Sequence, residues 1–239
     1  ELEMLWLNDL TASGEHWAVE AMDLNTASCM EINSGDSMQS ASVIKLFIMG
    51  AVYERAVYAA ECGKELIPMQ ETYDGELKDL LTAMITVSDN TAANELVSRL
   101  GQGDFDTGAA VVNEFCKDHG NAATYLGRRF LAETPSDDNY TSVADCTSFL
   151  SGLYNGTLLN VEASGKMLEL LEGQTVKGKI PAGLPNGVET ANKTGEMPSG
   201  YGLGSIENDV AIVMNGRYPY ILCVLSNDIA DNGSAQSVI

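Results

Sequence analysis

The hydrophobic pattern divides the chain into a first group of strands, a helical middle and a second group of strands. Apolar runs bounded by turn residues predict five strands. They span residues 17–24, 28–33, 188–193, 209–214 and 218–226. Asn215 and Gly216 lie between the last two, and both residue types tolerate the positive φ of a tight hairpin. We therefore expect the two ends of the chain to build one antiparallel sheet.

The segment between the two groups of strands has a helical pattern, from about residue 42 to about residue 178. Glycines and a proline interrupt the pattern and mark helix ends, at Gly63, Gly101, Gly103, Gly120 and Pro135. A further short amphipathic helix is predicted over residues 1–11. Strands from both termini with an inserted helical segment indicate an α+β fold.

The first helix of the middle segment contains a lysine among apolar residues. Residues 43–53 read V-I-K-L-F-I-M-G-A-V-Y, a pattern typical of a buried central helix. Burial would lower the pKa of Lys45 and make its amine a base. Ser42 lies one turn earlier, so the two side chains can meet and form a serine nucleophile with its base. The alternative is a serine helix cap followed by a lysine that reaches the surface.

Two polar tripeptides follow in order. S-D-N at residues 88–90 lies between one helix predicted around residues 77–85 and another over residues 91–100. K-T-G at residues 193–195 closes the strand that starts at Val188. Each tripeptide alone would occur by chance in roughly 3% of chains this long, so neither is specific by itself. Taken alone, Lys193 could equally be an edge-strand lysine that prevents aggregation.

Together the three motifs resemble the S-x-x-K, S-D-N and K-T-G signature of the penicillin-recognising active-site serine enzymes. The chain is most similar to their class A β-lactamase-like branch, over nearly its whole length. The resemblance implies one domain with the β-lactamase/transpeptidase-like fold. A five-stranded antiparallel sheet lobe would use residues 1–38 and 180–239, and an all-helical lobe would use residues 39–179, with the site in the cleft between them. Residues 232–239 are fewer than the family's usual C-terminal helix, so we expect incomplete coverage of one sheet face.

The resemblance implies four catalytic residues. Ser42 would attack a carbonyl carbon and become an acyl-enzyme, helped by the backbone N–H groups and dipole of a helix start. Lys45 would take the serine proton, and Ser88 would relay a proton toward the leaving nitrogen. Lys193 would keep Lys45 deprotonated by like-charge repulsion and attract a substrate carboxylate.

The same resemblance implies four binding residues. Asn90 would bind the amide of the substrate side chain, and Thr194 would share the substrate carboxylate. Gly195 would let the substrate lie flat along the strand, since it has no side chain. The backbone N–H of Glu196 would complete the oxyanion hole with that of Ser42, although a carboxylate side chain is unusual at this position in a drug-hydrolysing enzyme.

The loop before residue 140 departs from the class A pattern. That pattern has a water-activating glutamate two residues after an arginine, and an asparagine four residues later. Here Phe130 or Leu131 stands at the glutamate position, and Asp137 instead of asparagine follows Glu133. Glu133 is the candidate deacylating base, with a solvated loop carboxylate as the alternative. Slow deacylation is the expected consequence.

Composition excludes several other classes of function. The formal charge of −21 disfavours nucleic acid and anionic membranes as partners. No apolar run reaches the roughly 18 residues of a membrane-spanning helix. No G-x-S-x-G nucleophile elbow occurs. The five cysteines have no C-x-x-C spacing and the two histidines no ligand spacing, so we expect no metal and no cofactor, and at least one thiol that is free or paired between molecules.

Three hypotheses share the same nucleophile. The first is a class A-like β-lactamase that hydrolyses the β-lactam amide. The second is a D-Ala-D-Ala peptidase or an esterase, and the third is a non-catalytic receptor that stays acylated. In each case the partner is a small-molecule β-lactam or acyl-peptide, and we expect a monomer. The sequence starts without methionine or a signal-peptide pattern, so we expect a mature bacterial protein that is secreted, periplasmic or at the cell surface.

Overall fold

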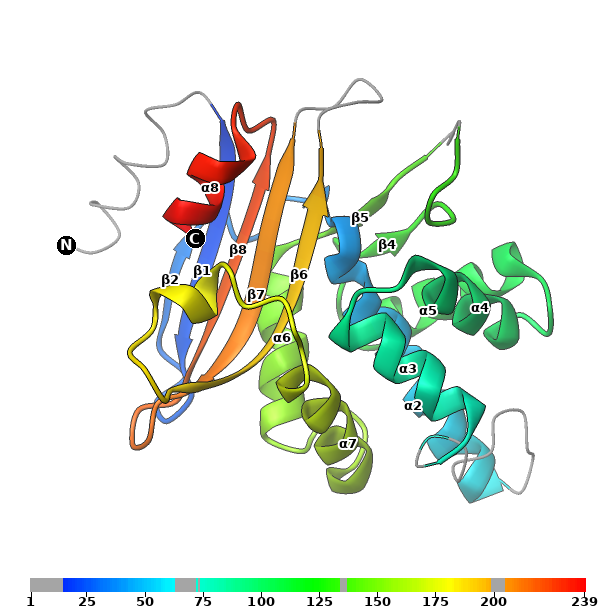
Figure 1. Cartoon of the computed structure of the whole chain (residues 1–239). Helices are drawn as coiled ribbons and strands as arrows, with labels where there is room; N and C mark the ends of the chain where they lie inside the picture. The colour runs from blue at the N-terminus through cyan, green and yellow to red at the C-terminus, as the bar shows by residue number, and fades with distance from the viewer. Residues whose placement is uncertain (1–14, 63–71, 73, 134–136, 199–204) are drawn as a thin grey trace.

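The computed structural model describes residues 15–62, 72, 74–133, 137–198 and 205–239. The helix expected over residues 1–11 lies outside this part. The main sheet is antiparallel with the strand order β2-β1-β8-β7-β6 (Figure 1). Its strands are β1 (His16–Asp23), β2 (Cys29–Ile32), β6 (Glu189–Met197), β7 (Ile206–Met214) and β8 (Tyr220–Asn227). The two ends of the chain meet where β1 pairs with β8, which confirms the predicted sheet.

The edge strand β6 is longer than expected. It continues to Met197, so the K-T-G motif lies inside the strand instead of closing it. In the register with β7, Lys193 pairs with Val210. The predicted hairpin between β7 and β8 is present, and Gly216 supplies its positive φ of 55°.

Helices dominate the middle of the chain. The helical elements are η1 (Ala41–Ile44), α2 (Lys45–Cys62), α3 (Glu76–Thr86), α4 (Asn90–Leu100), α5 (Phe105–Asp118), α6 (Val143–Tyr154), α7 (Val161–Glu172), η3 (Ile180–Gly183) and α8 (Asn232–Val238), where η marks a 3-10 helix. The helices predicted on both sides of the S-D-N motif are confirmed as α3 and α4. Within the described residues, we find no helix with both the length and the hydropathy needed to cross a bilayer.

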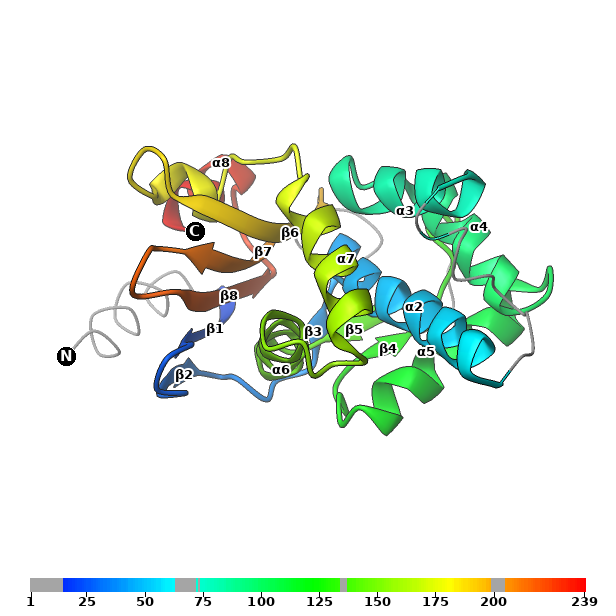
Figure 2. The same ribbon diagram turned by 90° about the horizontal axis from the view of Figure 1, so that it is seen from below.

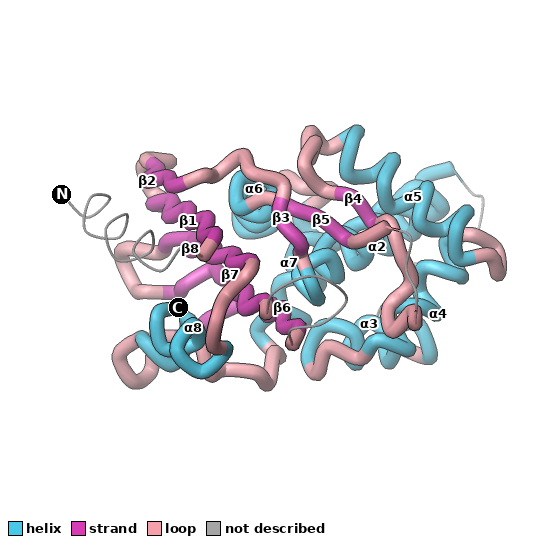
Figure 3. Tube along the Cα trace, turned by 90° about the horizontal axis from the view of Figure 1, so that it is seen from above, coloured by secondary structure: helices cyan, strands magenta, loops and turns pink. Residues whose placement is uncertain are grey.

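The middle segment is not helical throughout, and here the sequence prediction was incomplete. The strands β3 (Met38–Gln39), β4 (Tyr125–Leu126) and β5 (Asn139–Thr141) form a second sheet in the order β3-β5-β4 (Figure 3). Strands of two or three residues are too short to show a period of two in the sequence. This small sheet ties the chain just before η1 to the loop that precedes residue 140, since the Ser40 N–H donates to the Asn139 carbonyl at 2.9 Å.

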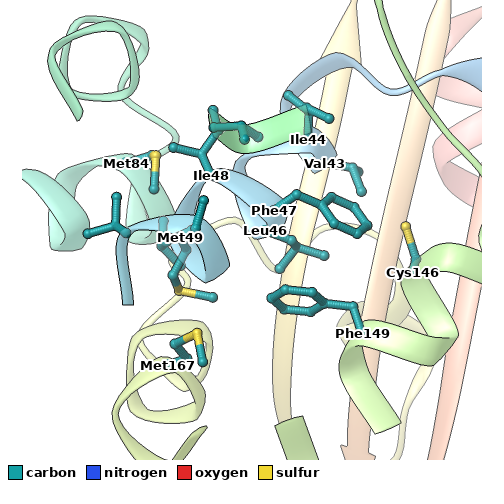
Figure 4. Close-up of a cluster of buried hydrophobic side chains, with 14 of the residues drawn as sticks. Val43, Ile44, Leu46, Phe47, Ile48, Met49, Met84, Cys146, Phe149 and Met167 are labelled. Carbon is teal, nitrogen blue, oxygen red and sulfur yellow. The ribbon is translucent and has the colours of Figure 1, made fainter. Parts of the chain in front are cut away.

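The helix α2 is the central helix that its apolar sequence predicts. It is surrounded by α3, α5 and α7 (Figure 2). Leu46 and Phe47 are fully buried. The Phe47 ring packs against Phe149 of α6 with 5.2 Å between the ring centroids (Figure 4). Residues at the start of α2 are therefore fixed by the main hydrophobic core.

Both faces of the main sheet are covered. On one face α6 packs against the strands, and the Thr147 hydroxyl of α6 donates to the Cys223 sulfur of β8 at 3.5 Å. On the other face lie η3 and α8 (Figure 1). Ala235 of α8 packs in a buried cluster with Trp17 and Val224. The short C-terminal stretch thus forms a helix that covers part of the face where we expected incomplete coverage.

Candidate active site

Ser42 lies in η1, the 3-10 turn that leads directly into α2. Ala41 before it has a φ of 44°, a conformation that costs energy in a residue with a side chain. The Gln39 side chain holds this turn, because its Oε1 accepts a hydrogen bond from the Ala41 N–H at 2.8 Å. The Ser42 hydroxyl faces Lys45, whose Nζ lies 3.0 Å from Ser42 Oγ. The serine and lysine meet as the helical spacing predicted.

Lys45 is completely buried, so the alternative of a lysine that reaches the surface is wrong. Its Nζ lies 2.7 Å from the Ser88 carbonyl oxygen and 3.1 Å from Ser88 Oγ. It also donates to Asn90 Oδ1 at 2.7 Å. The S-D-N motif thus supplies three further hydrogen-bond partners of this amine, in addition to Ser42 Oγ.

Ser88 lies between the lysines of the other two motifs, Lys45 and Lys193. It has a φ of 58°, which positions it at the sharp entry to α4, while the next residue, Asp89, caps the helix by accepting the Ala92 N–H at 2.7 Å. Lys193 Nζ of β6 donates to Ser88 Oγ at 3.0 Å and to the Thr194 carbonyl at 2.8 Å. One hydroxyl therefore lies within hydrogen-bond distance of two buried amines.

Burial lowers the pKa of both ammonium groups, so each loses its proton more readily than an exposed lysine. Desolvation lowers the pKa of Lys45 from 10.5 to about 7, against the opposing attraction of Asp89. Lys193 is also fully buried, and desolvation and then the charge of Lys45 hold its pKa well below 10.5. At neutral pH the neutral amine that a general base requires is therefore accessible at Lys45.

The backbone of β6 lies directly against η1, the turn that contains Ser42. A Cβ atom added to Gly195 would come 2.7 Å from the Ser40 carbonyl oxygen and 3.1 Å from the Ser42 nitrogen. Only glycine fits there without a shift of one of the two segments. Asn208, paired with Gly195 in β7, donates from Nδ2 to the carbonyl oxygens of Gln39 at 3.1 Å and Ser40 at 3.2 Å. The sheet and the η1 turn are therefore held close together.

Thr194 and Glu196, the two neighbours of Gly195 in β6, lie on the opposite face of the strand from Gly195. Thr194 is buried, while half of the Glu196 side chain is exposed. Glu196 Oε1 lies 3.1 Å from Nζ of Lys179, a buried lysine just before η3.

An aromatic ring stands where the loop pattern led us to expect a glutamate. Lys45 Nζ lies 4.7 Å from the centroid of the Phe130 ring. Asn94 of α4 holds this loop, because its amide accepts the Phe130 N–H at 3.0 Å and donates to the Phe130 carbonyl at 3.1 Å. Glu133 is exposed, and in the part of the chain that the structure describes no hydrogen bond or ion pair joins it to Ser42 or Lys45.

Potential metal ligands gather elsewhere. Among the described residues, Glu20, Cys29 and Glu31 form the one group of three side chains whose ligand atoms lie within 4.8 Å of each other. They belong to β1 and β2, at the edge of the sheet opposite β6. Cys116, Cys146 and Cys223 are buried thiols outside any disulfide. Cys223 is a small core residue, as expected.

Comparison with known proteins agrees with this geometry. The model of the β-lactamase enzyme family matches residues 6–239. The chain belongs to this family. β-Lactamase 3 of Bacillus cereus is 27% identical over 228 residues, which cover 87% of this chain and 68% of that protein. The carbapenem-hydrolysing β-lactamase KPC of Klebsiella oxytoca is 27% identical over 226 residues, which cover 86% of this chain and 74% of that protein.

The fold is that of the class A β-lactamases. A mutant of the class A β-lactamase of the last common ancestor of Gram-negative bacteria superposes with a TM-score of 0.81 at 25% identity. The match covers 100% of this chain and 94% of the ancestral protein. The predicted α+β fold and the predicted family are both confirmed.

Several residues that shape the site of this β-lactamase family member were missed in the sequence. Asp138 Oδ1 accepts hydrogen bonds from Gln39 Nε2 at 3.0 Å and from Arg128 Nε at 2.7 Å. The loop before β5 therefore supports the η1 turn through Gln39. Asn208 of β7 donates to the backbone just before Ser42, and Lys179 pairs with Glu196 of β6. No motif contains Asp138, Asn208 or Lys179, and their contacts join segments far apart in the chain, so no local pattern could have shown them.

Proposed function

We propose that this chain forms an acyl-enzyme on Ser42 with a β-lactam, and that it is a serine hydrolase of the class A type. The observation that supports this most directly is the hydrogen-bonded chain from Ser42 through Lys45 and Ser88 to Lys193. Its three links measure 3.0, 3.1 and 3.0 Å. The family and the curated relatives support the β-lactam amide as the bond that is attacked.

In the acylation step Ser42 Oγ attacks the carbonyl carbon of the lactam. The neutral amine of Lys45 takes the hydroxyl proton as the Oγ–C bond forms. The C–N bond then breaks, and the leaving nitrogen receives a proton from Ser88, which regains one from the Lys45 ammonium. Desolvation disfavours the charged form of Lys45, and the charge of Lys45 in turn lowers the pKa of Lys193.

The remaining motif residues bind the substrate. Asn90 uses Oδ1 for Lys45, which leaves its Nδ2 group to donate to the carbonyl of the substrate side-chain amide. The backbone N–H groups of Ser42 and Glu196 stabilise the developing oxyanion. Thr194, on the opposite face of β6 from Lys193, binds the substrate group on the other side of the reacting carbonyl. Gly195 keeps the strand close to the nucleophile, as its contact with the η1 backbone requires.

Hydrolysis of the acyl-enzyme is the slow part of the proposed cycle. A deacylating water needs a base near the ester carbon, yet the loop places the Phe130 ring, which has no basic group, 4.7 Å from Lys45 Nζ. Glu133 is the candidate base on this loop, and it is exposed to solvent. The Phe130 ring therefore favours, as a second candidate function, a receptor that is acylated and remains so.

Intact-mass spectrometry after mixing with benzylpenicillin tests the proposal. We expect an adduct of one benzylpenicillin that disappears slowly, and no adduct on the Ser42→Ala variant with an unchanged melting curve. An adduct that never decays would support the receptor. If the folded protein shows no adduct at all, the proposed function is wrong.

A further inference from the structure

The Glu196 carboxylate lies at the edge of the proposed site, close to where the carboxylate of a bound β-lactam is expected. Glu196 follows K-T-G directly, and alternate residues of a strand share a face, so its side chain lies on the same face of β6 as Thr194. Thr194 is the residue that we expect to bind a substrate carboxylate. Any anionic group held by Thr194 would therefore lie next to Glu196.

Glu196 is held in this place by a buried cation. Lys179 Nζ lies 3.1 Å from Glu196 Oε1, and its side chain is only 2% exposed. The same Nζ donates to the Asn208 carbonyl oxygen at 3.0 Å. An ammonium that is fixed by buried partners presents one geometry to Glu196, in contrast to a surface lysine, whose side chain samples many.

The positive charge of Lys179 is already neutralised by carboxylates of the protein, so it is not available to bind an anionic substrate. A second carboxylate, that of Glu207 in β7, lies 2.6 Å from its Nζ and is itself 2% exposed. Glu207 is fixed in turn by α8, since Asn232 and Gln236 donate to its Oε1 at 2.8 and 3.0 Å. One ammonium thus faces two carboxylates, and the group of three carries a net negative charge whose exposed member is Glu196.

The other cations near the K-T-G motif are also unavailable to pair with a substrate carboxylate. Lys193 is buried, and its Nζ is engaged by Ser88 and the Thr194 carbonyl. Arg128 is paired with Asp138 at 2.7 Å. Across the described part of the site, Glu196 is therefore the partly exposed charge closest along β6 to Thr194.

We propose that Glu196 determines the substrate class of this site: the preferred acyl donor carries a neutral or cationic group, not a carboxylate, on the side that faces Thr194. This inference rests on the proposed acylation of Ser42. A carboxylate there would meet the like charge of Glu196, whereas an ester, an amide or an ammonium would not. The resemblance alone would have implied the opposite preference, for an anionic substrate.

Two compounds that differ only in this charge test the inference. They are benzylpenicillin and its methyl ester, and the readout is the second-order rate constant for the mass adduct, divided by each compound's rate of alkaline hydrolysis. We expect the wild-type protein to favour the neutral ester by at least about tenfold. Glu196→Gln should reduce this preference at least about tenfold, mainly by faster reaction with the acid, because the like charge is removed.

Glu189→Gln is the matched control, because Glu189 is an exposed glutamate at the opposite end of the same strand. It should leave the preference within about twofold. If the wild-type protein reacts faster with the acid, or if Glu196→Gln changes both rates equally, this inference is wrong while the proposed function stands. The wild-type comparison decides the question even if Glu196→Gln does not fold. Absence of any Ser42 adduct with both compounds would contradict the proposed function, and the inference with it.

Discussion

Replacement of Lys45 by methionine separates the chemistry of this lysine from its packing. Methionine keeps an unbranched apolar stem among the core residues of α2 and removes the amine that lies 3.0 Å from Ser42 Oγ. Loss of a positioned general base costs about 10²–10⁴-fold in rate. We therefore expect acylation by benzylpenicillin to slow at least about 100-fold in the Lys45→Met variant.

The pH dependence follows from the lowered pKa of the same amine. Only the neutral amine can accept the Ser42 proton, so wild-type acylation should rise with pH through a midpoint near the Lys45 pKa of about 7 and level off once Lys45 is fully neutral. Stopped-flow mixing with intact-mass detection across this range measures the rate. The small remaining activity of Lys45→Met should lack the rise near pH 7.

Stability provides a second readout with a definite sign. The folded pKa of Lys45 lies below its ordinary value, so between about pH 7 and 10.5 the unfolded chain binds a proton that the folded chain does not. The contribution of Lys45 to the free energy of unfolding therefore increases with pH across this window, by at most about 5 kcal/mol. Relative to Lys45→Met, the wild-type protein should become more stable from pH 7 to 10.

Near wild-type acylation in a folded Lys45→Met variant would contradict the role of Lys45 as the base, because it would show that the proton leaves Ser42 by another route.

Three further substitutions test other parts of the site. Gly195→Ala should slow acylation and destabilise the protein by about 1–3 kcal/mol, because its Cβ would come 2.7 Å from the Ser40 carbonyl; an unchanged rate and melting temperature would contradict the close approach of β6 and η1. Glu133→Gln should change single-turnover deacylation by less than about tenfold, and a loss of 10²–10⁴-fold with unchanged acylation would make Glu133 the deacylating base. Asn94→Ala should lower the free energy of unfolding by about 1–3 kcal/mol, since it removes both hydrogen bonds to the Phe130 backbone, and calorimetry that shows no change would refute this role.

The sequence predicted those parts of the protein that depend on local spacing. Ser42 and Lys45 meet because they are one helical turn apart, and the apolar run around them predicts the burial that lowers the pKa of Lys45. The five main strands and the helices α3 and α4 were predicted from periodicity for the same reason. Ser88 and Lys193 are 105 positions apart, so their contact could be expected only from the resemblance to a known family.

What the sequence did not predict arises from contacts between distant segments without a motif. The Phe130 ring above Lys45, the Asn208 bonds to the η1 turn and the pair of Lys179 with Glu196 have no periodic signal. The small β3-β5-β4 sheet was missed because its strands are too short to alternate visibly. These are also the features in which this site departs from what its motifs alone imply.

The most direct test of the account is to locate the acyl group itself. The protein is mixed with benzylpenicillin, quenched in acid within the lifetime of the adduct, digested, and sequenced by tandem mass spectrometry. We predict that the added mass lies on Ser42 and on no other residue, because Ser42 is the hydroxyl that faces the buried Lys45 amine from the η1 turn. An adduct on Ser40 or Ser88 would contradict the central claim.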